Sequence, residues 1–142
     1  MEERICTYNK ETDNKYRWDD MVDNAPLEIY IPKWRVPDPY PLRISVQIFE
    51  PADSRCPIVT IHGKKEVKAK PGLRLVPITA EVTFTEVKEL TVRYDPVLVG
   101  NDAREIGSPY IPKALLDDPP QTRLVIVINW KTGNMAYHNS TY

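Results

Sequence analysis

The sequence is poor in the residues on which many enzymes and small secreted proteins depend. In 142 residues it has two histidines, two cysteines and five glycines. Cys6 and Cys56 are single and far apart, which suits reduced core residues better than a disulfide. A zinc site would need ligands converging from distant parts of the chain, so we expect no metal and no cofactor.

Long apolar runs are also missing. No stretch approaches the roughly 18 apolar residues of a membrane span. The N-terminus, Met-Glu-Glu-Arg-Ile-Cys, is acidic and lacks the apolar core of a signal peptide. We therefore expect a cytoplasmic protein with no membrane partner. A net charge of -1 gives the chain as a whole no attraction to nucleic acid.

Proline is abundant, with fourteen residues, and this favours stiff loops and short strands over long helices. The most apolar stretch, Leu124 to Trp130, begins with five aliphatic residues and is bounded by Pro120 and Gly133. Its length and its β-branched residues predict a central strand that is buried on both faces.

Alternation of apolar and polar residues predicts further strands in the ranges 27–31, 43–50, 78–84 and 90–94. We also expect two hairpins: a strand at 58–61 with a turn at 62–65 and a return arm at 66–70, and an edge strand at 135–138 after a turn at 131–134. The sequence thus predicts a mainly β protein, an antiparallel sandwich or barrel of about eight short strands with one or two short helices. An α+β fold is the alternative.

We expect a single β-rich domain over 1–142, and we see no internal repeat. Residues 1–26 form a polar N-terminal arm, in which Trp18, Met21 and Val22 have helical spacing. This predicts a short helix ended by Pro26, and the alternative is an irregular arm that lays Trp18 on the core. Pro112 to Asp117 is expected to form one helical turn.

Aromatic residues gather on the segment from Tyr30 to Tyr40, where the prolines between Pro32 and Pro41, four in all, enforce an extended backbone. Tyr30, Trp34, Arg35 and Tyr40 are residue types that are enriched at protein interfaces. If exposed, they predict a contact surface, for example for a second copy of the chain. If buried, the segment is a strap that closes one end of the core.

The middle of the sequence is basic. Residues 43–74 carry seven Lys and Arg against three Asp and Glu. Lys64, Lys68 and Lys70 are candidates for binding phosphates, but no aromatic residue lies between His62 and Phe84 to stack on bases. The alternative is a solvated edge whose lysines prevent pairing with other sheets. Nucleic acid is therefore an unfavoured partner.

His62 lies beside Gly63 at an expected turn, where a general base could be exposed. The spacing of residues in the sequence does not pair His62 with a nucleophile or with a carboxylate that would orient its ring. We therefore assign no catalytic residue. Trp130 ends the apolar strand where the core meets the surface, and it could form one wall of a binding site.

Three functions follow from these features, in decreasing order of support. The first is a non-enzymatic module for protein interaction or assembly, with a homo-oligomer or another protein as partner. The second is a small-molecule-binding barrel or enzyme that uses His62, Lys64 and the acidic loop at 95–105. The third is weak nucleic-acid binding through the basic hairpin at 64–74.

Overall fold

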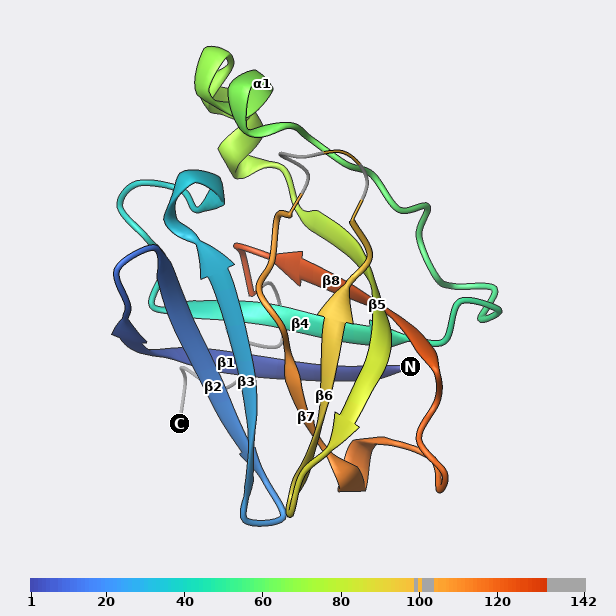
Figure 1. The fold of residues 1–142 in the computed structure, drawn as a ribbon. Helices are drawn as coiled ribbons and strands as arrows, with labels where there is room; N and C mark the ends of the chain where they lie inside the picture. The colour runs from blue at the N-terminus through green and yellow to red at the C-terminus, as the bar shows by residue number, and fades with distance from the viewer. Residues whose placement is uncertain (99, 101–103, 133–142) are drawn as a thin grey trace.

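A computed structural model describes residues 1–98, 100 and 104–132 of the chain. Eight strands close into a barrel in the order β1-β2-β3-β7-β6-β5-β8-β4, and every strand is antiparallel to both neighbours (Figure 1). The strands are β1 (Glu2–Glu11), β2 (Lys15–Val22), β3 (Ala25–Pro32), β4 (Arg43–Phe49), β5 (Ile78–Val87), β6 (Thr91–Pro96), β7 (Tyr110–Pro112) and β8 (Arg123–Asn129). The predicted mainly β fold is confirmed. Of the two predicted architectures, sandwich and barrel, the structure is a barrel.

Helices in the described residues are short. They comprise the α-helix α1 (Lys64–Ala69) and the 3-10 helices η1 (Lys33–Arg35), η2 (Pro71–Leu75) and η3 (Lys113–Leu115). None of them has the length and apolar character that crossing a bilayer requires.

The central strand predicted from the apolar run is β8, which pairs with β4 on one side and β5 on the other. Leu124, Ile126 and Ile128 point into the barrel. Val125 and Val127 point outward, where they pack with Phe49, Cys56 and Val59. The strand is therefore buried on both faces, because the chain after β4 passes over its outer side.

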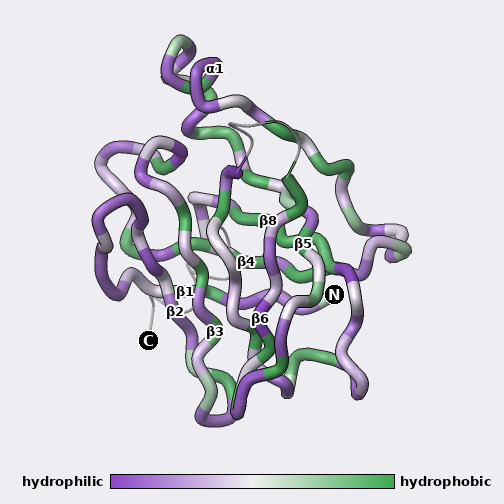
Figure 2. The backbone as a smooth tube through the Cα atoms, in the orientation of Figure 1, coloured by the Kyte–Doolittle hydropathy of each residue, from purple (hydrophilic) through white to green (hydrophobic). Residues whose placement is uncertain are grey.

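Side chains fill the inside of the barrel. Apolar and polar residues alternate along strands such as β3 and β4, and the colours of the tube in Figure 2 change accordingly, whereas β8 is apolar from Leu124 to Ile128. Trp18 and Tyr94, the two largest aromatic side chains of the interior, have no exposed surface. An eight-stranded barrel is narrow enough for side chains to occupy its interior.

Two expected elements are wrong. Residues 15–22 form a strand rather than a helix, because they pair with β3 along their whole length, from Lys15 opposite Pro32 to Val22 opposite Ala25. Residues 64–69 form α1 rather than the return arm of a hairpin. That segment is rich in the good helix formers Lys, Glu and Ala, and Val67 is its buried residue.

The remaining local expectations have mixed outcomes. The predicted strand at 58–61 is reduced to one bridge between Thr60 and Thr79. The helical turn expected after Pro112 is η3. The hairpin predicted for 131–138 extends outside the described residues.

The barrel contains an internal repeat, which corrects the expectation of none. Strands β1 to β4 form a Greek key with the spatial order β4-β1-β2-β3, and β5 to β8 form a second one with the order β8-β5-β6-β7. The strand pairs correspond: Thr7 lies opposite Asp19 and Thr83 opposite Asp95, and both hairpins have an irregularity just beyond this pair. A pseudo-twofold axis passes between β4 and β8, where Gln47 pairs with its equivalent, Val127.

The repeat is visible in the sequence once the structure aligns it. Residues 30–48 match residues 110–128 with an offset of 80, and both stretches fold as strand, 3-10 helix, extended connection and strand. The identical positions include the run Tyr-Ile-Pro-Lys at 30–33 and 110–113, and also Asp38/Asp118, Pro39/Pro119, Arg43/Arg123 and Ile48/Ile128. The first hairpins match with a different offset, 76, so no single period runs through the chain.

The two halves cover opposite ends of the barrel. The neighbouring strands β3 and β7 run in opposite directions, and η1 follows β3 whereas η3 follows β7. Two long connections, which we call the insertions, make the two ends unlike. Residues 50–77 link β4 to β5, and the β6–β7 connection is long, whereas β2 and β3 are joined by the tight turn at Asp23 and Asn24. The insertions meet at the η1 end (Figure 1).

Candidate functional site at the basic end of the barrel

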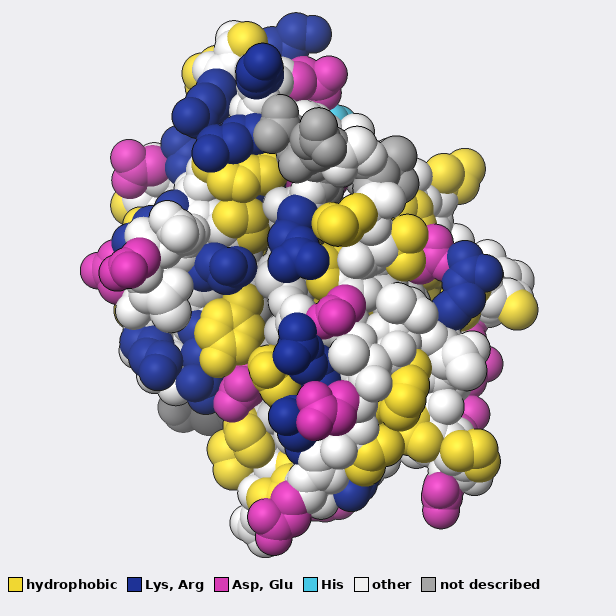
Figure 3. All heavy atoms as spheres, in the orientation of Figure 1, with side chains coloured by type: hydrophobic (Ala, Val, Ile, Leu, Met, Phe, Trp, Pro, Cys, Tyr) yellow, Lys and Arg dark blue, Asp and Glu magenta, His cyan; other side chains and the backbone are white. Residues whose placement is uncertain are grey.

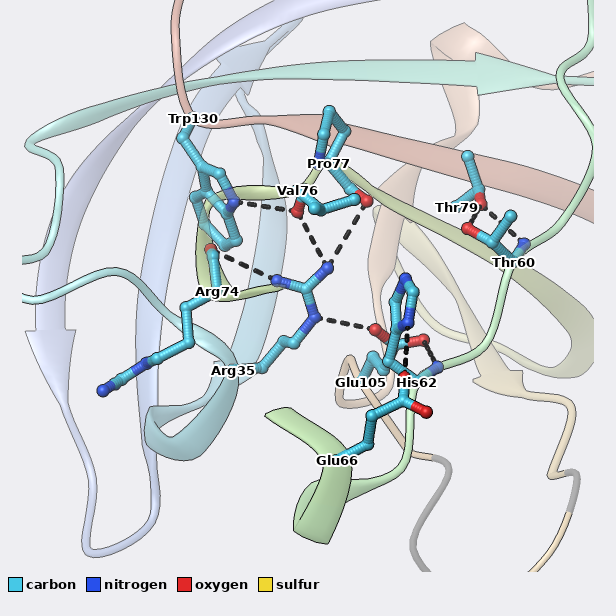
Figure 4. Close-up of polar contacts among 10 residues, drawn as sticks. All are labelled: Arg35, Thr60, His62, Glu66, Arg74, Val76, Pro77, Thr79, Glu105 and Trp130. Carbon is cyan, nitrogen blue, oxygen red and sulfur yellow. Dashed lines mark hydrogen bonds and ion pairs between the residues drawn. The ribbon is translucent and has the colours of Figure 1, made fainter. Parts of the chain in front are cut away.

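Arg35 is the residue on which the η1 end of the barrel is organised. Its side chain has no exposed surface. Its Nε donates to Oε1 of Glu105 at 2.7 Å, and its terminal nitrogens donate to the carbonyls of Arg74 at 3.3 Å and Val76 at 2.8 Å (Figure 4). One guanidinium thus holds both insertions against η1.

Glu105 and Trp130 extend this network. Oε2 of Glu105 accepts a hydrogen bond from the backbone N–H of His62 at 3.1 Å. The indole Nε1 of Trp130 donates to the carbonyl of Val76 at 3.2 Å. Three predicted site residues, Arg35, His62 and Trp130, therefore belong to one network (Figure 4). Its partners are mostly backbone groups, so its role is to fix the insertions in place.

His62 lies where the first insertion turns into α1. Its Nδ1 is 3.1 Å from Oε1 of Glu66, four residues later. The nearby cavity, lined in part by Ile61, Thr79 and Glu105, has a volume of about 40 Å³. That is room for a few water molecules at most and too little for a metabolite. In the part of the chain that the structure describes, no group of three His, Cys, Asp or Glu side chains could hold a metal ion.

Trp34 meets the lysines of α1 in a shallow groove, which we call the Trp34 groove. It has a volume of about 450 Å³ and is lined by Asp13, Asn14, Pro32, Lys33, Trp34, Lys64 and Lys68. A smaller hollow of about 190 Å³ shares Trp34 and Lys68 and adds Val67, Pro71 and Arg74. The structure thus brings Trp34, Lys64 and Lys68 together across about 30 residues of sequence.

The Trp34 groove lies on a basic part of the surface, where three lysines, Lys33, Lys64 and Lys68, line it together with one acidic residue, Asp13. Lys64, Lys65, Lys68 and Lys70 are all exposed, and Figure 3 shows dark blue side chains gathered over α1 and the adjoining part of the barrel. Lys33 is paired with Glu11 at 2.5 Å, and this hydrogen bond raises the pKa of Lys33, so Lys64 and Lys68 are the cations of the groove left for a ligand. Several cations close to one partly apolar wall favour a negatively charged ligand.

Contacts within the site keep the groove walls in place. A terminal nitrogen of Arg74 donates to the carbonyl of Lys33 at 2.9 Å, which ties η2 to η1. Val67 is fully buried and anchors α1 on the same side. Trp34 itself is half-buried, so part of its ring remains available in the groove.

The other predicted site residues lie elsewhere. Tyr40 is half-buried in an aromatic cluster with Tyr8, Tyr16 and Trp18, and its ring centroid lies 4.5 Å from that of Tyr8. Tyr30 is on β3 outside the barrel, where its hydroxyl donates to Glu28. Lys70 ends α1 and is exposed, but it does not line the groove.

The segment from Tyr30 to Tyr40 has both of the roles that its sequence suggested. Arg35 and Val36 are fully buried, so the segment closes one end of the barrel. Trp34, between these buried residues and Lys33, also contributes to an open groove. One segment can therefore both close the end of the barrel and contribute to an open groove.

Sequence reasoning missed Lys33, and it included Arg74 and Glu105 only as the ends of the basic segment 64–74 and the acidic loop 95–105, without their contacts to Arg35. The repeat could have pointed to the first of these, because Lys33 stands in the Tyr-Ile-Pro-Lys run that recurs at 110–113. The repeat also draws attention to Trp34 and Arg35, because the residues at the equivalent positions, Ala114 and Leu115, are chemically very different from them. Glu105 and Arg74 lie in the insertions and have no such signal.

Comparison of the chain with protein-family models, with curated proteins and with solved structures finds no match.

Proposed function

We propose that this protein is a non-catalytic interaction module whose Trp34 groove binds an acidic segment of a partner protein. The observation that carries the proposal is the position of Trp34 beside Lys33, Lys64 and Lys68 in one groove of about 450 Å³. Trp is prominent among the residues that dominate binding energy at interfaces, and the surrounding cations select partners by charge.

The groove suits an extended segment better than a small molecule. It is shallow and open, and it continues into the hollow at Pro71 and Arg74. Its walls come from elements anchored by buried Arg35 and Val67, so little ordering is needed on binding. Peptide carboxylates can reach Lys64 and Lys68 while an apolar side chain covers the exposed part of Trp34.

The test is titration of the protein with an oligoglutamate peptide, followed by calorimetry and by tryptophan fluorescence. We expect binding that weakens with added salt, because exposed charges are screened over about 10 Å at 0.1 M ionic strength. The variant Lys64→Gln/Lys68→Gln should lower the affinity about tenfold or more, and Trp34→Ala should have a similar effect.

Lys113→Gln is the matched control, since Lys113 is the structural equivalent of Lys33 at the opposite end of the barrel. It should leave oligoglutamate binding unchanged. Wild-type protein that does not bind the peptide at low salt would overturn the proposal, and so would binding that is the same in all four proteins.

A second candidate function is binding of single-stranded nucleic acid at the same groove. The specific observation in its favour is that Trp34, which is remote in sequence, supplies the aromatic surface that the basic segment at 64–74 lacks. A titration with an oligonucleotide in place of the peptide separates the two candidates, because tighter binding of the oligonucleotide would favour this one.

A further inference from the structure

The end of the barrel opposite the Trp34 groove has a second groove of different character, which we call the η3 groove. It lies between η3 and the end of β5 and has a volume of about 530 Å³. Its apolar lining comes from Val87, Ala114, Leu116 and Pro120, and its charged lining comes from Lys113, Asp117 and Asp118.

The two grooves occupy equivalent places in the two halves of the barrel. Lys33 and Trp34 line one, and their equivalents Lys113 and Ala114 line the other. The shared frame makes the differences informative: the first groove is flanked by lysines of α1, whereas the second is flanked by two exposed aspartates. Each copy of the chain therefore has grooves of unlike charge at its two ends.

Further acidic side chains surround the η3 groove. A hollow of about 240 Å³ shares Asp117 with it and is also lined by Glu2, Glu50 and Asp53. Of these, Asp53 is paired with Arg55, whose hydrogen bonds lower the pKa of Asp53 to about 2. Among the residues that line these two hollows, Lys113 is the one lysine against Glu2, Glu50, Asp53, Asp117 and Asp118, so a basic surface would complement this end.

The basic end offers a projecting surface that complements this recess. In Figure 1, α1 stands out from the barrel above the ends of the strands. It presents Lys64, Lys65 and Lys68, and Leu75 in the following η2 is 69% exposed. At the acidic end Val87 and Leu90 are about half exposed, at 50% and 51%. Apolar and charged groups are therefore available on both surfaces.

We propose that the acidic segment is residues 117–120 of a second copy of this chain, which meet the lysines beside Trp34 while the η3 groove of that copy receives α1 and η2 of the first. This inference rests on the proposed function, because it names the partner that the basic end binds. Contact joins unlike ends, so each pair of copies keeps one free basic end and one free acidic end. Such a heterologous contact continues into a ring or an open filament instead of stopping at a dimer.

Sedimentation of the whole protein over a range of concentrations is the first test. At low salt the weight-average mass should rise with concentration beyond twice the chain mass of 16.4 kDa. Raising the salt from about 0.05 M to about 0.5 M should return it to the monomer, because the contact depends on exposed charges.

Two neutralising variants test which surfaces meet. Lys64→Gln/Lys68→Gln removes charge from the basic end, and Asp117→Asn/Asp118→Asn removes it from the acidic end. Each variant alone should associate about tenfold more weakly or worse. A mixture of the two retains one intact basic end and one intact acidic end, so it should form 1:1 dimers that grow no further.

Lys10→Gln/Arg43→Gln and Asp23→Asn are the matched controls. They change exposed charges that do not line either groove, and they should assemble like the wild type. Circular dichroism checks that every variant is folded.

The outcomes separate this inference from the proposed function. Wild-type protein that stays monomeric at low salt but binds oligoglutamate through Lys64 and Lys68 would overturn the self-docking and leave the proposed function standing. Growth that stops at a dimer, or mixed variants that fail to form 1:1 dimers, would also overturn it. Wild-type protein that neither binds oligoglutamate nor assembles at low salt would overturn both the self-docking and the proposed function.

Discussion

Arg35 shows how much a single buried side chain contributes to the shape of the site. Its guanidinium joins η1 to Glu105 in one insertion and to the carbonyls of Arg74 and Val76 in the other. A buried ion pair adds little net stability compared with apolar residues, but loss of one partner leaves the other charge uncompensated. Arg35 therefore matters most for holding the groove walls in position.

Replacement of Arg35 by Met should destabilise the protein by about 3 to 5 kcal/mol, because Glu105 would remain buried without its cation. Denaturant unfolding measures this change. Leu115→Met, at the equivalent position of the second half, is the control and should cost less than about 1.5 kcal/mol. Adding Glu105→Gln to Arg35→Met should restore part of the lost stability, because it removes the uncompensated charge. A double variant as unstable as Arg35→Met alone would contradict this expectation.

Asp95 gives a residue-scale prediction on pH. Its Oδ1 accepts a hydrogen bond from the Ser108 hydroxyl at 2.6 Å, and this bond lowers the pKa of Asp95. A carboxyl group whose pKa is lowered by folding stabilises the protein above its ordinary pKa of about 3.9, and this contribution is lost as pH falls through the lowered value.

Ser108→Ala should therefore raise the pKa of Asp95 toward its ordinary value and make acid unfolding less steep below about pH 4. Carboxyl carbon shifts in an NMR titration measure this. Asp53 provides an internal control, since its pKa is lowered by Arg55 and should not change. An unchanged Asp95 titration would mean that Arg93 or Thr85 sustains the low value.

At the scale of elements, the two extended connections that cross the barrel ends are attached in the same way. Trp18 on β2 donates from Nε1 to the carbonyl of Pro41 at 2.9 Å. Its equivalent, Tyr94 on β6, donates from its hydroxyl to the carbonyl of Gln121 at 2.7 Å. Different aromatic residues thus satisfy the same backbone group in each half.

Tyr94→Phe should cost about 0.5 to 1.5 kcal/mol, because it removes this hydrogen bond and retains the ring in the core. Thermal or denaturant unfolding measures the loss. Tyr110→Phe, on a half-buried ring at the outer face of β7, is the control and should change stability by less than about 0.5 kcal/mol. Equal effects of the two variants would show that the hydroxyl of Tyr94 is not needed to hold the connection.

Local patterns predicted most of the strands and failed where distant partners decide the structure. Alternation identified β3, β4, β5 and β6 because each has one face on the core. Residues 15–22 have helical spacing at Trp18, Met21 and Val22, but pairing with β3 determines their conformation. The Trp34 groove could not be predicted, since it combines η1 with α1 from the far side of β4.

At the scale of the whole molecule, the halves meet along two seams, β3 with β7 and β4 with β8. The interior is shared, so each half by itself would leave much of its apolar surface uncovered. These features predict that the chain can be cut between the two halves, but that neither half is stably folded without the other.

A chain cut in the first insertion, between Pro57 and Ile58, should therefore reassemble from its fragments. Coexpressed fragments 1–57 and 58–142 should copurify in a 1:1 ratio and unfold in one transition. A cut between Asp23 and Asn24, inside one Greek key, is the control and should give weaker reassembly. A fragment 58–142 that folds alone as a monomer would contradict the prediction.

The pseudo-twofold axis also has a consequence for what a single chain allows at the two ends of the barrel. A chain of half the length, with one Greek key, has all the pairing edges needed to close this barrel as a symmetric dimer. In such a dimer every substitution appears twice, once at each end. Joining the halves in one chain removes that constraint. Trp34 beside α1 at one end, with Ala114 in the same place at the other, is a difference that such a symmetric dimer could not have.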